Sequence, residues 1–204
     1  QVSTYQSDIT CTVLHRQVAR HVLGVEFDPD TGQDDLFDRA WEKEHKFPGS
    51  YMCRAIGGVE TALWDLRGKV AGAPVATLLG GSPGRLRAYA SSMKRDITPE
   101  AEAERFRRLR GEYGFDAFKF RIGAECGRNS DEWEGRTEAI IPEIAGTFRG
   151  EAVTLLADAN SFYSPDLAIH YGRMLQDHGI THYEEPCPYW ELEQTAEVTA
   201  ALEI

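Results

Sequence analysis

Short strand-like segments alternate with longer helix-like segments after residue 84, and this alternation restricts the possible folds more than any other feature of the sequence. The strand-like segments are residues 86–92, 117–123, 152–160 and 180–186, and a segment with a helical pattern follows each of them. Strands joined through helices run parallel in one sheet, because a parallel pair needs a long crossover connection. The sequence therefore predicts an α/β domain whose parallel sheet is either doubly wound or closed into a barrel.

The helices of this region carry start and stop signals. Thr98-Pro99-Glu100 and Ser164-Pro165-Asp166 each combine a capping hydroxyl residue, a proline at the first helical position and an acidic residue in the first turn. Gly179 is expected to end the second of these helices. Further helices are predicted around residues 133–148 and from about Tyr189.

The first third of the chain is expected to be helical. Apolar residues recur at helical spacing in residues 14–22, 36–41 and 56–70. The longest of these stripes consists of Ile56, Val59, Leu63, Leu66 and Val70. Five small or helix-breaking residues follow at 80–84, so we expect two domains, 1–83 and 84–204.

Composition excludes several classes of protein. The 204 residues include 22 Lys and Arg against 33 Asp and Glu, which gives a net charge of −11 with His neutral. An acidic surface repels phosphate backbones, so we expect no nucleic-acid partner. The longest uncharged stretch, residues 70–84, is shorter than the roughly 20 residues that a membrane helix needs. Because the N-terminus also lacks a basic segment followed by an apolar one, we expect a soluble cytoplasmic protein with no membrane partner.

The four cysteines are far apart and form no C-x-x-C pair. They are Cys11, Cys53, Cys126 and Cys187. This spacing indicates neither a zinc site nor a dense disulfide framework. We expect reduced thiols with mostly structural roles.

Charged and polar residues gather at the ends of three predicted strands. Period-two alternation places Phe118, Phe120 and Ile122 on one face of the second strand, so Lys119 and Arg121 point the other way. In the third strand Asp158 and Asn160 share a face near the carboxyl end. In the fourth strand Glu184 shares the face of His182, whereas Glu185 is expected to point away.

Parallel sheets and barrels place their active sites at the carboxyl ends of their strands. Two carboxylates from neighbouring strands that face two cations would form an oxygen site for Mg²⁺ beside an anion-binding pair. Other interpretations stay open, because Asp-x-Asn is also a turn and capping pattern and Lys119 and Arg121 could simply form ion pairs with the carboxylates. His182 is expected to be a hydrogen-bonded core histidine.

Read in order, the motifs resemble the enolase superfamily and, within it, the mandelate racemase and muconate-lactonizing enzyme group. Residues 57–69 (GGVETALWDLRGK) and 78–81 (LLGG) are similar to the last long helix of that group's capping domain and its connection to the barrel. Lys119-Phe120-Arg121, Asp158-Ala159-Asn160 and Glu184-Glu185-Pro186 resemble its lysine motif and its metal carboxylates on barrel strands two to four. The ordered set covers nearly the whole chain.

The resemblance implies an α/β fold with a (β/α)8 TIM-type barrel. Residues 84–204 would supply its first four βα units, and residues 1–83 the mostly helical C-terminal part of the capping domain. Since the family's third metal ligand and its His and Asp acid–base pair would follow Ile204, we expect a portion of a protein nearly twice as long, inactive alone. Family members are commonly homo-oligomers.

The resemblance also implies roles for the site residues. Asp158 and Glu184 would bind Mg²⁺, which would hold a substrate carboxylate and stabilise an enediolate formed by removal of the alpha proton. Lys119 would act in catalysis and contact the substrate carboxylate, and Asn160 would contact the substrate. Arg121 would also act in catalysis, at the position where many members of the family have the base lysine.

Arginine stays protonated at ordinary pH and accepts protons poorly, which favours a mechanism with one base over a two-base racemase. We therefore expect a dehydratase that converts a sugar acid into a 2-keto-3-deoxy acid. A racemase or epimerase, a lactonizing cycloisomerase and a non-catalytic homologue are the alternatives. The sequence leaves the sugar acid and its stereochemistry open.

Overall fold

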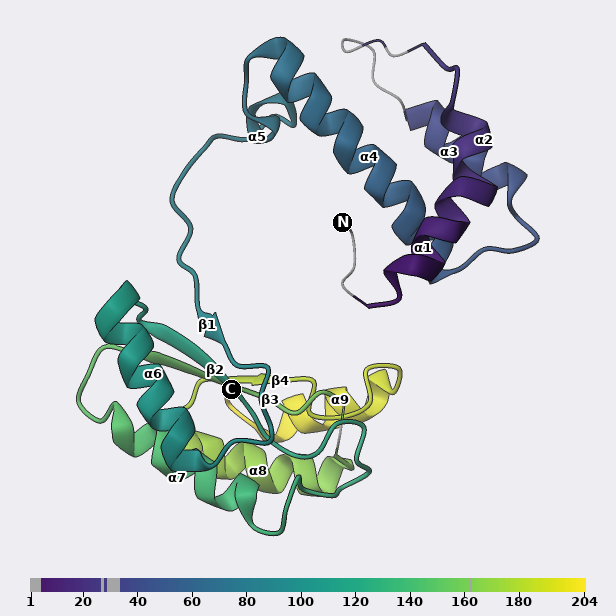
Figure 1. Cartoon of the computed structure of the whole chain (residues 1–204). Helices are drawn as coiled ribbons and strands as arrows, with labels where there is room; N and C mark the ends of the chain where they lie inside the picture. The colour runs from purple at the N-terminus through teal and green to yellow at the C-terminus, as the bar shows by residue number, and fades with distance from the viewer. Residues whose placement is uncertain (1–4, 27, 29–33, 162) are drawn as a thin grey trace. The chain divides into compact units, whose positions relative to one another are not determined.

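The computed structural model describes residues 5–26, 28, 34–161 and 163–204 (Figure 1). The chain divides into two compact units, an N-terminal unit of Gln1–Arg85 and a C-terminal unit of Leu86–Ile204. Each unit has its own hydrophobic core.

The described part of the N-terminal unit is helical, as the spacing of its apolar residues predicts. A buried cluster joins its helices and consists of Val18, Ala40, Met52, Ala55 and Ile56. The helices are α1 (Ser7–Val13), the π-helical turn η1 (Leu14–Val18), α2 (Ala19–Val22), α3 (Asp34–Lys43), α4 (Ser50–Ala71) and α5 (Val75–Leu78).

The predicted apolar stripe on α4 is buried at one end only. Ile56 lies in the core, whereas Leu66 is 41% exposed and Val70 is 61% exposed. The reason is that α1 and η1 pack on α4, and Ile56 belongs to the cluster that they share with it. The helix ends at Gly72, whose φ of 62° is the left-handed conformation that glycine adopts readily at a helix end.

The C-terminal unit is the predicted α/β domain. Its four strands form one parallel sheet in the order β1-β2-β3-β4. The strands follow chain order without the reversal that defines a doubly wound sheet, so the arrangement is that of consecutive units of a barrel. The elements are β1 (Ala90–Ser91), α6 (Pro99–Tyr113), β2 (Ala117–Arg121), α7 (Arg136–Thr147), β3 (Thr154–Asp158), α8 (Pro165–Asp177), β4 (His182–Glu184) and α9 (Leu192–Ala201).

Several of these elements are shorter than predicted. The first strand was expected over residues 86–92 but pairs only at Ala90 and Ser91, and Leu86 is 93% exposed. The register explains this limit, because Ala90 lies opposite Phe118, one residue after β2 begins.

Two helices also begin later than predicted. Helix α7 begins at Arg136 because Gly135 has a φ of 78°, outside the right-handed helical region. Helix α9 begins at Leu192 rather than near Tyr189, because the Glu191 N–H donates to the Pro188 carbonyl oxygen at 2.8 Å in a turn before the helix.

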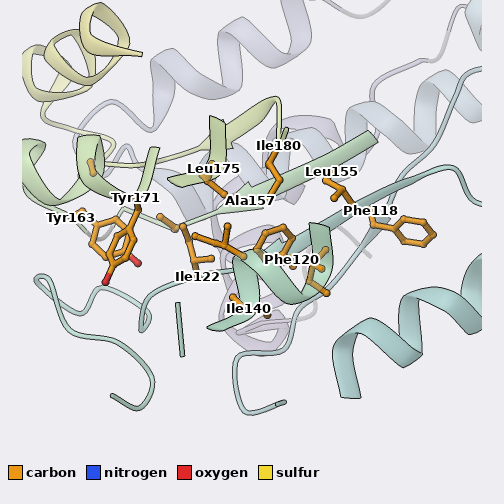
Figure 2. Close-up of a cluster of buried hydrophobic side chains, with 14 of the residues drawn as sticks. Phe118, Phe120, Ile122, Ile140, Leu155, Ala157, Tyr163, Tyr171, Leu175 and Ile180 are labelled. Carbon is orange, nitrogen blue, oxygen red and sulfur yellow. The ribbon is translucent and has the colours of Figure 1, made fainter. Parts of the chain in front are cut away.

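One face of the sheet carries the core of the C-terminal unit, and α6, α7 and α8 lie along it (Figure 1). Phe118, Phe120 and Ile122 belong to this core, whereas Lys119 and Arg121 contact Asp158 instead, which confirms the predicted alternation along residues 118–122. The Phe118 ring stacks on Phe106 and Phe148, with ring centroids 4.8 Å and 5.1 Å apart. Figure 2 shows the β2 residues in one cluster with Ile140, Leu155, Ala157, Leu175 and Ile180.

All four cysteines lie in the described residues and are free thiols. Cys187 is buried, whereas Cys11, Cys53 and Cys126 are exposed. None of the helices in the described ranges is long and apolar enough to cross a membrane.

Candidate functional site

The carboxyl ends of β2, β3 and β4 bring the predicted site residues into one row. Arg121 lies opposite Asp158 in the register between β2 and β3, and Asp158 lies opposite Glu184 in the register between β3 and β4. Lys119 lies two residues earlier on β2 and therefore on the same face as Arg121. The parallel register thus places the four side chains together, although 65 residues of sequence separate Lys119 from Glu184.

Lys119 connects the two carboxylates. Its side chain is 7% exposed, and its ammonium nitrogen lies 2.7 Å from Glu184 Oε2 and 3.1 Å from Asp158 Oδ2. The Tyr89 ring also contacts this ammonium group, with its centroid 5.4 Å from the same nitrogen. One cation therefore contacts a carboxylate from each of two neighbouring strands.

All three nitrogen atoms of the Arg121 guanidinium have acceptors. Nη1 donates to Asp158 Oδ2 and, at 2.8 Å, to Asn160 Oδ1. Nε donates to the Ser92 carbonyl oxygen at 3.0 Å, and Nη2 lies 3.2 Å from Met93 Sδ. Burial, followed by the nearby charge of Arg95, lowers the pKa of Arg121. Because its acceptors favour the protonated form, Arg121 is a charged clamp between strand ends.

Asp158 and Asn160 are held as a unit at the end of β3. Asp158 is 1% exposed, and its Oδ1 accepts a hydrogen bond of 2.9 Å from the Asn160 backbone N–H. Asn160 has a φ of 48°, a left-handed conformation that asparagine tolerates better than most residues. This backbone conformation directs the Asn160 side chain toward Arg121.

Two predictions about β4 and its loop are wrong. Glu185 was expected to point away, but its φ of 47° turns the backbone and its Oε2 lies 3.3 Å from Asn160 Nδ2. His182 was expected to be a core histidine, but it is exposed and its Nδ1 lies 2.9 Å from Thr181 Oγ1. In the described sheet β4 has a partner strand on one side only, which explains the exposure of His182.

Arg95 is the site residue that the sequence analysis missed. It lies in the loop between β1 and α6, and its Nη2 donates to Asn160 Oδ1 at 2.6 Å. Its Nε donates to the Gly123 carbonyl oxygen at 3.1 Å, just beyond β2. The signal was available, since a polar residue that follows a strand of a parallel sheet lies at the same edge as the other strand ends.

The carboxylates are suited to a hard divalent cation. Asp158 and Glu184 present oxygen ligands from adjacent strands, and the Lys119 ammonium between them shows that one cation can contact both. The ion pairs that the sequence left as an alternative to a metal site are therefore present, and they do not exclude it. Among the residues that the structure describes, no group of three or more His, Cys, Asp or Glu is placed to hold a metal ion.

The comparisons with known proteins identify the family. Residues 101–204, half of the chain, match the family described as enolase C-terminal domain-like, and residues 6–80 match the mandelate racemase / muconate lactonizing enzyme N-terminal domain. The chain therefore belongs to the enolase superfamily, in the mandelate racemase and muconate lactonizing enzyme group, as its motifs predicted.

The curated relatives include enzymes named as a dehydratase, a cycloisomerase and a dipeptide epimerase. Arabinonate dehydratase from Saccharolobus solfataricus is 33% identical over 180 residues, which cover 84% of this chain and 45% of the relative. D-galactarolactone cycloisomerase from Agrobacterium fabrum is 35% identical over 150 residues, which cover 72% of this chain and 37% of the relative. The chain thus spans less than half the length of these relatives.

Solved structures share the fold. The structure of a candidate racemase from Roseobacter denitrificans is 65% identical with a TM-score of 0.93, covering 100% of this chain and 55% of that one. A mandelate racemase/muconate lactonizing protein from Paracoccus denitrificans, whose structure was determined in complex with magnesium, is 27% identical with a TM-score of 0.82. The match covers 96% of this chain and 52% of that one.

Proposed function

We propose that the full-length enzyme is a Mg²⁺-dependent dehydratase that converts a sugar acid into a 2-keto-3-deoxy acid. The chain would contribute two metal ligands, Asp158 and Glu184, and the residues that surround them. The observation that carries this proposal is that both carboxylates lie at the carboxyl ends of adjacent strands and contact one ammonium group, that of Lys119.

Bound Mg²⁺ would supply a fixed positive charge against the anionic charge that develops on the substrate carboxyl group when the alpha proton leaves. Asp158 would be held for this task, because the Asn160 N–H and the Arg121 guanidinium fix its two oxygen atoms. Glu184, whose side chain is 44% exposed, would approach the cation from β4. The magnesium complex of the Paracoccus denitrificans protein supports the choice of metal.

Lys119 and Arg121 would have different roles. Lys119, whose ammonium contacts both carboxylates, would contact the substrate carboxylate beside the metal ion. Arg121 would supply permanent positive charge and hold Asp158, because its guanidinium nitrogens are engaged by protein acceptors. Asn160 would contact the substrate from the end of β3.

This division of roles favours dehydration. In that reaction one base removes the alpha proton, the hydroxyl group on the beta carbon leaves as water after protonation, and the resulting enol tautomerises to the keto acid. A protonated Arg121 does not interfere, since no second base is needed at its position. The name of the Saccharolobus solfataricus relative, an arabinonate dehydratase, supports the same reaction.

Racemisation is the second candidate. The 65% identical structure from Roseobacter denitrificans is described as a candidate racemase, and Lys119 could serve as one of the two acid–base groups that a racemase needs. Lactone cycloisomerisation is supported by the Agrobacterium fabrum relative.

One experiment separates these reactions. Full-length enzyme with Mg²⁺ is incubated with a panel of sugar acids in D₂O, and the products are followed by proton NMR. A dehydratase forms a 2-keto-3-deoxy acid and releases water. A racemase or epimerase returns the acid with deuterium at the alpha carbon, and that result without keto acid would overturn the proposal. Turnover that persists after removal of divalent metal would overturn the proposed metal site.

A further inference from the structure

Asn160 is the proposed substrate contact, and its carbonyl oxygen is already occupied. Oδ1 accepts one hydrogen bond from Arg95 Nη2 at 2.6 Å and another from Arg121 Nη1 at 2.8 Å. An amide oxygen has two lone pairs, so these two donors saturate it. The assignment of oxygen and nitrogen is determined by chemistry, because a guanidinium can only donate and an amide NH₂ cannot accept.

The Asn160 NH₂ group therefore faces the opposite direction. Nδ2 lies 3.3 Å from Glu185 Oε2, which uses one of its two N–H donors. Asn160 is half-buried, and among the described residues its remaining N–H has no hydrogen-bond partner, so it is available to a ligand. A substrate atom that contacts Asn160 must then be a hydrogen-bond acceptor.

We propose that Arg95 is a positioning residue that, together with Arg121, orients the Asn160 amide as a donor to a hydroxyl or carboxylate oxygen of the substrate. The identity of the ligand rests on the proposed function, whereas the orientation of the amide rests on the hydrogen bonds alone. Arg95 acts from outside the strand motifs, because it reaches Asn160 from the loop after β1.

The position of Arg95 suits this role. Its Nε donates to the Gly123 carbonyl oxygen while its Nη2 donates to Asn160, so a planar guanidinium joins the polypeptide beyond β2 to the polypeptide beyond β3. Burial of the half-buried side chain lowers the pKa of Arg95, but arginine remains a cation in proteins. The Asn160 oxygen is thereby held between two cations, and reversal of the amide would place its NH₂ group against them.

The test is a double-mutant cycle in the full-length protein with Mg²⁺. Arg95→Met, Asn160→Ala and the double variant are titrated calorimetrically with two probes, arabinonate and mandelate. Arg95→Met is expected to weaken binding of the acid about tenfold, the loss expected for one charge-assisted hydrogen bond. In the Asn160→Ala background the same substitution is expected to have no further effect, because Arg95 acts through Asn160. An equal loss in both backgrounds would overturn the proposal.

Three further variants separate positioning from general structure. Asn160→Asp keeps acceptors for both arginines but removes the donor, so it should weaken binding as much as Asn160→Ala; unchanged affinity would show that the ligand uses the oxygen. Arg95→Lys should recover part of the affinity lost in Arg95→Met. Arg87→Met is the matched control, since Arg87 donates to Asp116 Oδ1 and Thr154 Oγ1 at the opposite end of the strands. It should leave acid affinity within twofold of the unsubstituted protein.

Thermal unfolding of the four proteins of this cycle, measured without acid, gives a readout that does not depend on the proposed function. Arg95→Met should lower the midpoint more in the native background than in the Asn160→Ala background, and equal shifts would overturn the contact. If neither acid binds the unsubstituted protein, the panel of sugar acids tests the substrate class, and this thermal cycle by itself decides the role of Arg95 in holding the amide.

Discussion

Asp158 and Glu184 lie directly opposite each other across β3 and β4, and a single ammonium group, that of Lys119, contacts an oxygen atom of each. Two carboxylates this close repel each other unless a cation lies between them. The Lys119 ammonium supplies that cation here, and a divalent metal would meet the same need in the proposed site, so the two carboxylates are the first residues to test.

Removal of either carboxylate charge should abolish the metal-dependent reaction. Asp158→Asn and Glu184→Gln in the full-length enzyme are expected to lower Mg²⁺-dependent turnover of the sugar acid at least about a hundredfold, because each removes an anionic ligand. Calorimetric titration with Mg²⁺ should show the corresponding loss of metal affinity. Undiminished activity in either variant would contradict the assignment of the site.

Arg121→Met should destabilise the C-terminal unit. The substitution leaves Asp158, which is 1% exposed, without its guanidinium partner, and breaking a buried ion pair from one side costs about 3 kcal/mol. Urea unfolding of the full-length protein measures this change. Lys69→Met is the control, since the Lys69–Asp65 pair is exposed and should contribute less than about 0.5 kcal/mol. Equal effects of the two substitutions would show that Arg121 is not a clamp.

Glu44→Gln should make stability less dependent on pH in acid. Hydrogen bonds from His21, with Nε2 2.8 Å from Glu44 Oε1, and from Arg20 lower the pKa of Glu44 below its ordinary value of 4.5. A carboxyl group whose pKa is lower in the folded state stabilises the fold above pH 4.5, and this contribution is lost as the pH falls through the folded-state pKa.

The native protein is therefore expected to exceed Glu44→Gln in stability by about 1 kcal/mol at pH 7. The difference should shrink as the pH falls below 4.5, which urea unfolding at a series of pH values would measure. A constant difference down to pH 3 would mean that the Glu44 charge is not what stabilises the N-terminal unit. Asp65→Asn, in the exposed pair with Lys69, serves as the control.

Phe118→Ala should be among the most destabilising substitutions in the C-terminal unit. Phe118 is fully buried and stacks on two other phenylalanine rings, so its truncation leaves a cavity and costs about 3–5 kcal/mol. Leu86→Ala is expected to stay within about 0.5 kcal/mol of the native protein, because Leu86 is 93% exposed. A comparable loss at Leu86 would indicate that the first strand extends further than its pairing at Ala90 and Ser91.

The alternation of apolar residues was enough to predict the core face of β2. Phe118, Phe120 and Ile122 had to share one face because strand side chains alternate, and the structure confirms that all three are buried. The limits of β1 were not predictable in the same way, since a strand extends only as far as its neighbour offers hydrogen bonds. Whether His182 is buried also depends on what lies beside β4, which no local pattern contains.

By themselves, the residue types and their spacing determined the parallel α/β fold and the family. They also determined that Lys119, Arg121, Asp158 and Glu184 group at one edge of the sheet. Only the tertiary structure decided which charges meet: Lys119 with both carboxylates, and Arg95 and Arg121 with the Asn160 oxygen. The physical reason is that the alternation of side chains between the two faces of a strand follows from the local backbone. The partner of each side chain depends instead on the register between strands and on loops far apart in the sequence.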